Sequence, residues 1–190
     1  PVFSKMVKEW RRLKEGIKHI DRDIVLNKQI EVDVVRCHQY HHIMKTKAAK
    51  EVVSAILLTW VHVYQTESYK SELLKGGAYW QGIDSIAAVF AVLNCVFDVG
   101  SVDNEPNIAR ALFSLDRFVN KFLSGYFVQV GHEGRMQSDL VVLSKLITWI
   151  DVEIGSHLEL VGFGPELYAI PWLLTCFAHV LPMEKIYLLW

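Results

Sequence analysis

Apolar residues recur every three or four positions along most of this chain, the spacing that places them on one face of an α-helix. Two such stripes precede residue 65: Met6, Trp10, Leu13, Ile17 and Ile20, and then Val53, Ile56, Leu57, Trp60 and Tyr64. Sustained alternation of period two, which is typical of strands, is limited to short ambiguous pieces near Val25 and Val128. The pattern therefore predicts an all-α domain.

The second half of the chain continues the helical pattern. Ile83 to Phe97 is apolar on most sides, so we expect it to form the central helix. Pro106 suits the first turn of a helix that begins after Asn104. The inward positions that we expect in that helix and the next are Ile108, Leu112, Leu115, Phe118 and Phe122, and then Met136, Leu140, Leu143, Ile147 and Ile150. The last helices are expected over 165–180, with a kink or start at Pro171, and over 182–190. Breaks are expected at 21–28, 68–78, 100–105 and 125–134.

Composition narrows the class of protein. The chain has 190 residues, 52% of them hydrophobic and 22% charged, which is typical of one folded globular domain. A net charge of −1 argues against nucleic-acid binding. The three cysteines show no paired spacing, so we expect reduced thiols and no zinc site. The N-terminus lacks a signal peptide and the longest apolar run, 167–181, is too short to span a bilayer. We therefore expect a cytoplasmic protein that does not insert into membranes.

The segment Ile30–Arg36 reads I-x-x-D-x-x-R. Arginine stays charged at any working pH and presents five donors in a planar fork, which suits the oxygens of a phosphoryl group. On a helix Asp33 and Arg36 share a face, so the carboxylate could orient the guanidinium while Ile30 anchors the turn in the core. The alternative is an ordinary surface arginine paired with a nearby acid.

The segment Tyr79–Gly82 reads Y-x-Q-G. The Gln81 amide can accept a hydrogen bond from water and donate one to a phosphoryl oxygen. Gly82 permits a sharp turn or a close backbone approach, and Tyr79 and Trp80 are expected to set the loop against the core. The alternative is that Gln81 only caps a helix starting near Ile83. An arginine and a glutamine are what nucleoside-triphosphate hydrolysis requires, yet the sequence has no G-x-x-x-x-G-K-[ST] loop. The pair therefore suits a protein that completes another protein's active site.

In this order, the two segments resemble the arginine and glutamine motifs of TBC domains, which activate Rab GTPases. Trp172–Phe177, Pro182 and Leu189–Trp190 resemble the family's third motif. Four longer stretches are similar to the TBC-domain-containing protein kinase-like group: Gln29–Asp33, Arg36–Tyr40, Tyr79–Ser85 and Leu167–Trp172. Val35 and Cys37 depart from the proline and threonine that are common in the family on either side of the arginine.

The resemblance implies one multi-helical TBC domain over 1–190. Its N-terminal lobe would cover about 1–125 and hold both motifs, and 126–190 would begin a C-terminal lobe. Since the family's third motif continues past its tryptophan, we expect that the C-terminal helices are missing. Arg36 and Gln81 would act in trans, supported by Ile30, Asp33, Tyr79 and Gly82, on a Rab-family GTPase that brings its own GTP and Mg²⁺. No cofactor of the chain itself is expected.

Two other interpretations stay open at this point. The first is a catalytically silent TBC scaffold or Rab-binding module in membrane trafficking. With either function, we expect that any location on endomembranes comes through partners. The second is a metal site built from Cys37, His38, His41 and His42, in which His38 and His42 would share a helical face. Because no partner motif accompanies these residues, we expect them to pack around the arginine turn instead. The sequence does not identify the Rab, the compartment or the oligomeric state.

Overall fold

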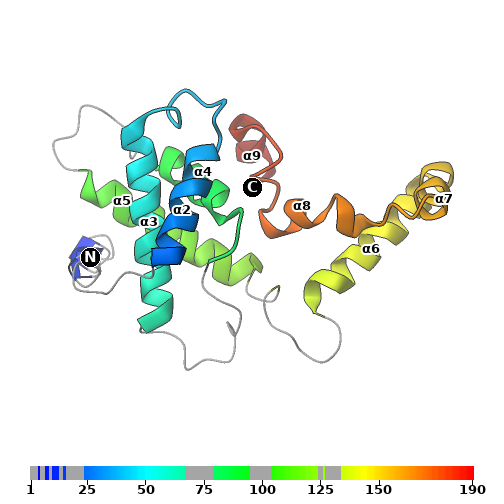
Figure 1. The fold of residues 1–190 in the computed structure, drawn as a ribbon, viewed down its shortest axis with the longest axis horizontal. Coiled ribbons are helices and arrows are strands. Elements are labelled where there is room, and N and C mark those ends of the chain that lie inside the picture. The colour runs from blue at the N-terminus through cyan, green and yellow to red at the C-terminus, as the bar shows by residue number, and fades with distance from the viewer. Residues whose placement is uncertain are drawn as a thin grey trace.

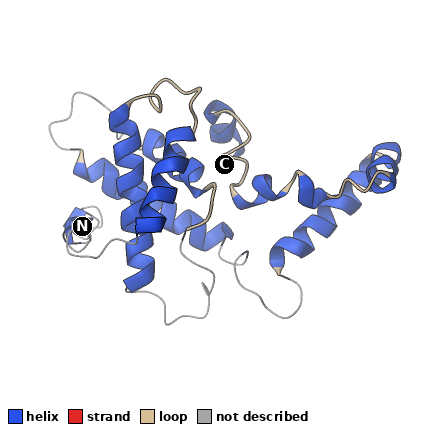
Figure 2. Cartoon of the chain, viewed as in Figure 1, coloured by secondary structure: helices blue, strands red, loops and turns tan. Residues whose placement is uncertain are grey.

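A computed structural model describes residues 4, 7, 8, 10–12, 15, 24–66, 79–94, 104–123, 126 and 134–190. Every regular element in these ranges is helical (Figures 1 and 2), so the predicted all-α class is confirmed. The elements are α2 (Ile24–Arg36), α3 (Lys47–Thr66), α4 (Ile83–Leu93), α5 (Glu105–Phe118), the π-helical turn η2 (Val119–Leu123), α6 (Arg135–Ile150), α7 (Val152–Leu160), the 3₁₀ turn η4 (Pro165–Leu167), α8 (Ile170–Leu174) and α9 (Met183–Leu189). None of the helices in these ranges has the length and apolarity needed to cross a membrane.

Helix α4 lies at the centre of the main body, with α2, α3 and α5 packed around it (Figure 1). Its side chains from Ile83 to Val89 are all buried, as expected for a helix covered on most sides. Ala87, Ala88 and Ala91 are fully buried, and such small side chains let neighbouring helices approach closely. The predicted central helix is confirmed, but it ends at Leu93, where the Asn94 N–H donates to the Phe90 carbonyl.

The first two predicted stripes face this core wherever the structure describes them. Trp10 is buried, and so are the four α3 residues Val53, Ile56, Leu57 and Trp60. The side chains of Met6, Leu13, Ile17, Ile20 and Tyr64 lie outside the described residues. Helix α2 already begins at Ile24, so the break predicted over 21–28 is wrong from that residue on. The reason is that Leu26, Ile30 and Val34 form a helical stripe against the core.

Helix α5 begins as predicted, with Pro106 in its first turn. Leu112 and Leu115 are buried, but Phe122 is 43% exposed, so its predicted inward position is wrong. Phe122 lies in the π-helical turn η2, whose wider hydrogen-bond spacing shifts the side chains out of the 3.6-residue period. Its ring still lies 4.9 Å from that of Phe118.

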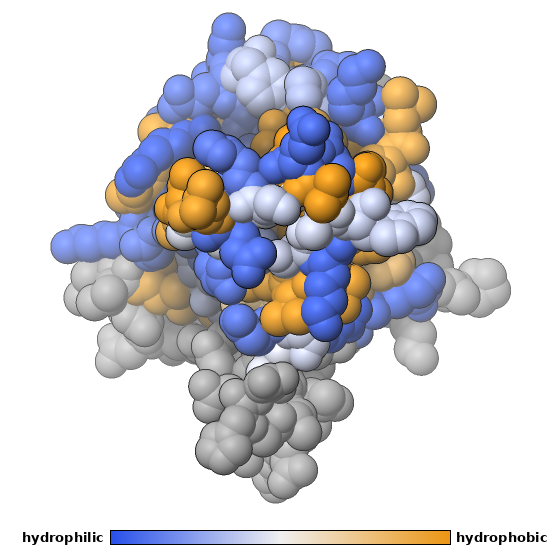
Figure 3. Space-filling view, turned by 90° about the vertical axis from the view of Figure 1, so that its right-hand side faces the viewer, coloured by the Kyte–Doolittle hydropathy of each residue, from blue (hydrophilic) through white to orange (hydrophobic). Residues whose placement is uncertain are grey.

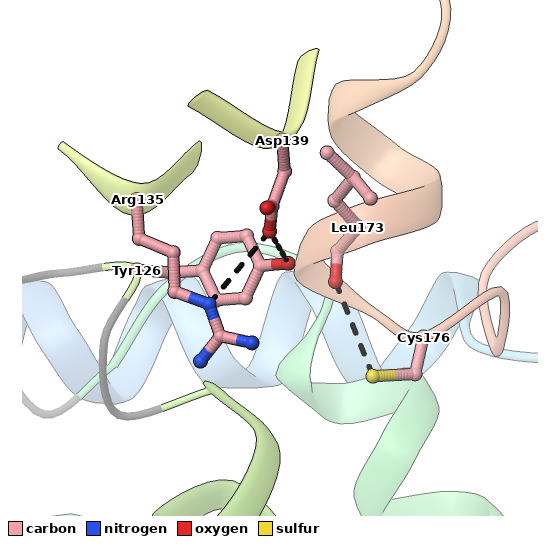
Figure 4. Close-up of polar contacts among 5 residues, drawn as sticks. All are labelled: Tyr126, Arg135, Asp139, Leu173 and Cys176. Carbon is pink, nitrogen blue, oxygen red and sulfur yellow. Dashed lines mark hydrogen bonds and ion pairs between the residues drawn. The ribbon is translucent and has the colours of Figure 1, made fainter. Parts of the chain in front are cut away.

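Helices α6 and α7 form an arm that projects from the main body (Figure 1). At its base the Tyr126 hydroxyl donates to Asp139 at 2.6 Å, and the Arg135 guanidinium lies over the Tyr126 ring (Figure 4). The predicted α6 stripe is wrong as a core face, because only Leu140 is buried and Ile150 is 76% exposed. Hydrophobic side chains are therefore visible among polar ones at this end of the molecule (Figure 3).

The chain returns from the arm to the main core at its end. The helix predicted over 165–180 is wrong, because Cys176 and Phe177 have φ of 46° and 68° and interrupt it. Pro171 instead lies in the first turn of the short helix α8. Of the two roles predicted for this proline, a kink or a helix start, the structure shows the helix start. Ala178, Met183 and Ile186 are buried in the core, and the Trp190 ring lies 4.5 Å from that of Phe118. The domain limits 1–190 and the lobe boundary near 125 stay predictions.

Candidate functional site

Arg36 is the last residue of α2, where a cation interacts favourably with the negative end of the helix dipole. Its side chain is exposed and forms no hydrogen bond or ion pair with any residue that the structure describes. Asp33 does not orient it, contrary to one expectation. The Asp33 carboxylate is buried and accepts hydrogen bonds from the Gln29 amide at 2.9 Å and from the Tyr79 hydroxyl at 2.7 Å. Ile30 is fully buried, as predicted for the anchor of this turn.

Gln81 lies in the turn that leads into α4. Its side chain is exposed and makes no hydrogen bond within the described residues, so it does not cap the helix. The cap position belongs to Gly82, whose φ of 106° is one that residues with side chains rarely adopt. Tyr79 and Trp80 pack against the core, as predicted for this loop. The Gln81 amide is therefore presented by a loop that its neighbours hold in place.

Two hydrogen bonds join the arginine segment to the glutamine segment. The first is Tyr79 to Asp33 at 2.7 Å, and the second runs from the His38 Nε2 to the Ser85 carbonyl at 3.1 Å. Arg36 lies between Asp33 and His38 in the chain, and Gln81 lies between Tyr79 and Ser85. The two exposed side chains therefore belong to neighbouring segments that are tied together before and after each of them.

The third motif packs on the glutamine loop, a contact that sequence reasoning did not predict. The Trp80 indole N–H donates to the Leu174 carbonyl at 3.3 Å, and the Ser85 hydroxyl lies 3.2 Å from the His179 Nδ1. A Cβ atom placed on Gly82 would lie 2.7 Å from the Thr175 methyl group. The glycine after the glutamine was the one signal in the sequence for such a close approach.

Replacing Gly82 by alanine is expected to lower the free energy of unfolding by about 2–4 kcal/mol. The cost combines a strained backbone conformation with overpacking against Thr175. Gly134 is a matched control, since it has φ of −68° and nothing within 4 Å of its added Cβ. Because Gly134 is the N-cap residue of α6, where alanine is less favourable than glycine, Gly134→Ala should still cost up to about 1 kcal/mol. Urea unfolding of both variants measures the difference, and equal midpoints would contradict the close packing of the loop.

The polar groups buried beneath the site are uncharged or acidic. Burial and the negative charge of Asp84 raise the pKa of the Cys37 thiol well above its usual value. Burial and the charge of Asp33 raise the pKa of Asp84, whose carboxylate accepts from the Gly82 N–H at 3.0 Å. Burial lowers the pKa of His38 to about 4, so its imidazole is neutral at physiological pH. The Cys37 thiol and the His38 ring are therefore neutral beneath the site, and Arg36 and Gln81 are the exposed polar side chains that the two motifs present above them.

The histidines after Arg36 are not arranged as a metal site. Residues 37–46 form turns, so the prediction that His38 and His42 share a helical face is wrong. Both ring nitrogens of His38 are engaged with Tyr40 and Ser85, and the His41 ring stacks on that of His42. Across the described ranges, no group of three or more His, Cys, Asp or Glu side chains is placed to hold a metal ion. His38 packs at the arginine turn, as expected.

Comparison with known proteins identifies the type of domain. The family model of the Rab-GTPase-TBC domain matches residues 4–190. The chain belongs to this family. The TBC domain-containing protein kinase-like protein of Homo sapiens is 37% identical over 173 residues, which cover 90% of this chain and 17% of the relative. The protein of the same name from Dictyostelium discoideum is 34% identical over 164 residues, covering 86% of this chain and 14% of the relative.

A solved TBC structure confirms the fold. The Ypt/Rab-GAP domain of Gyp1p superimposes with a TM-score of 0.76 at 17% sequence identity. The match covers 97% of this chain and 59% of the Gyp1p chain. The TBC domain described here thus spans about a sixth of the length of its kinase-like relatives and about three fifths of the solved domain.

Proposed function

We propose that this TBC domain stimulates GTP hydrolysis by a Rab-family small GTPase, with Arg36 and Gln81 supplied in trans. The observation that supports this most strongly is the pairing of the two segments through Asp33 and Tyr79, with both functional side chains left exposed. An exposed side chain that is not engaged within the fold is free to contact a second protein. Arg36 and Gln81 find no partner among the described residues.

The surroundings of Arg36 also favour docking of another protein. Val32 is 44% exposed and lies one helical turn before Arg36, on the same face of α2. A partner that covers this apolar side chain would therefore also lie against the Arg36 guanidinium.

The proposed chemistry uses each group for one task. The Arg36 guanidinium would stabilise the charge that develops on the transferred phosphoryl group, and the Gln81 amide would orient the attacking water. Neither task requires a proton transfer by this chain. An arginine supplied to a GTPase is worth about 10³–10⁵ in rate, or about 4–7 kcal/mol of barrier. GTP and Mg²⁺ would be held by the partner.

The decisive experiment is single-turnover GTP hydrolysis by a panel of Rab GTPases loaded with GTP, with and without this chain. Acceleration of at least one Rab by about 10³ or more is expected. A chain that binds a Rab without accelerating its hydrolysis would overturn the catalytic proposal. We further propose that the domain reaches endomembranes through such a Rab partner.

The second candidate is a catalytically silent TBC scaffold. It is favoured by the arm, where Trp149, Ile150 and Leu160 are 83%, 76% and 84% exposed, a surface suited to a protein partner. Rab binding that is unaffected by Arg36→Ala, with no acceleration across the panel, would favour the scaffold.

A further inference from the structure

Helix α2 ends in an unusual way just after Arg36. His38 has φ of 44°, the left-handed conformation that glycine usually provides at the end of a helix. A residue with a side chain adopts this conformation at a cost in free energy, so something else must hold it there. The His38 ring is 7% exposed and both of its nitrogens have partners.

The partners fix the direction of a hydrogen-bond relay. The Ser85 carbonyl can only accept, so the His38 Nε2, at 3.1 Å, carries the hydrogen of the neutral ring. The Nδ1 must then accept, and the Tyr40 hydroxyl donates to it at 2.8 Å. The Tyr40 oxygen in turn accepts from the Met183 N–H at 3.0 Å. The Leu181 carbonyl, at 3.5 Å from Tyr40, is the weaker choice for the hydroxyl hydrogen.

This relay joins three elements that are far apart in the chain. Met183 is the first residue of α9, Tyr40 and His38 lie in the turn after α2, and Ser85 lies in the first turn of α4. The same turn also donates a hydrogen bond to the end of α2, from the Cys37 N–H to the Asp33 carbonyl at 3.0 Å. A displacement of α9 would therefore be transmitted through these hydrogen bonds to the C-terminal end of α2, which carries Arg36.

We propose that His38 and Tyr40 are positioning residues that couple the seating of α9 to the C-terminal turn of α2 and thereby orient Arg36. The coupling itself is a property of the fold. Its consequence for catalysis rests on the GTPase-activating function proposed above. The orientation matters because a misplacement of about 1 Å in a catalytic group can reduce a rate by about 10².

Two variants separate this role from simple helix termination. Tyr40→Phe removes only the hydroxyl of a ring that is 53% exposed, so the core is not disturbed. His38→Gly suits the left-handed backbone at least as well as histidine, but it breaks the relay and also empties the space of a buried ring, so Tyr40→Phe is the decisive variant. The matched control is Tyr187→Phe, which removes a hydroxyl from α9 itself, one that contacts the Met183 sulfur at 3.6 Å.

Amide hydrogen exchange of the whole chain tests the coupling without any GTPase. In Tyr40→Phe and in His38→Gly we expect exchange to become about tenfold faster both in a peptide containing Met183 and in one covering 33–37, at the end of α2. Tyr187→Phe should leave the peptide at 33–37 unchanged. Faster exchange at Met183 alone, or a His38→Gly variant that matches the parent, would overturn the proposal.

Hydrolysis assays then test the catalytic consequence. With a responsive Rab, both variants should lower the maximal stimulated rate by about tenfold, while the half-saturating concentration of the domain changes by less than about twofold. A rise in that concentration at an unchanged maximal rate would show a binding role and contradict positioning. If the parent stimulates no Rab, the proposed function fails while the exchange result still decides whether the coupling exists.

Discussion

Replacing Arg36 by alanine is expected to lower the maximal stimulated rate of GTP hydrolysis by about 10³–10⁵. The guanidinium would be the main source of charge stabilisation for the transferred phosphoryl group, and no other described side chain replaces it at the end of α2. Arg36→Lys should recover only part of the loss, because an ammonium keeps the charge but lacks the planar fork. Single-turnover hydrolysis at saturating concentrations of each variant measures both effects.

The Arg36 variants should leave the fold intact, since the side chain is exposed and has no partner among the described residues. We expect their unfolding free energies to lie within about 0.5 kcal/mol of the parent. Arg117→Ala, which removes an exposed arginine from the last turn of α5, is the control for lost charge and should retain full stimulation. Equal losses in the Arg36 and Arg117 variants would indicate a general electrostatic effect and not a catalytic arginine.

Replacing Gln81 by alanine is expected to lower the stimulated rate by about 10²–10³, the usual cost of removing one oriented polar group from a transition state. The effect should fall on the maximal rate, because an amide that positions water contributes little to partner binding. A second assay is more specific. If Gln81 supplies the water-orienting amide, the parent chain should still accelerate a Rab whose own catalytic glutamine has been replaced.

Gln137→Ala provides the control for Gln81. Its side chain lies on the arm and contacts only Glu166 at 3.5 Å among the described residues, so stimulation should be unchanged. A Gln81→Ala variant that stimulates as well as the parent would show that the partner uses its own glutamine. The double variant with Arg36→Ala should lose less than the product of the single losses, because both groups serve one transition state.

The sequence predicted most strongly the elements whose burial follows one simple period. The described part of the α3 stripe, Leu112 and Leu115 of the α5 stripe and the α4 run up to Leu93 pack as expected, because each helix buries one face or nearly all faces in the same core. The prediction that the α6 stripe faces the core was wrong. A helical period shows that one face is apolar, but it does not show which part of the molecule covers that face. The helix predicted over 165–180 was wrong because two residues in the left-handed conformation, Cys176 and Phe177, interrupt an otherwise helical pattern.

Within the site, the residue types were predictable and their partners were not. The motif spacing indicated Asp33 as the partner of Arg36, since residues three apart share a helical face. In the structure the Asp33 carboxylate instead accepts a hydrogen bond from the Tyr79 hydroxyl, because Asp33 lies on the face of α2 that packs against the glutamine loop. The relay through His38 and Tyr40 to Met183 was also beyond sequence reasoning, since its ends are separated by nearly the whole domain.

Residue identities by themselves determined the helical class and the family and pointed to Arg36 and Gln81 as candidate site residues, since these depend on local periodicity and on short motifs. Only the packed molecule decided that the arginine and glutamine segments lie side by side, and that the end of the chain supports both. Such decisions depend on hydrogen bonds and close contacts between residues distant in the chain, which no local pattern contains.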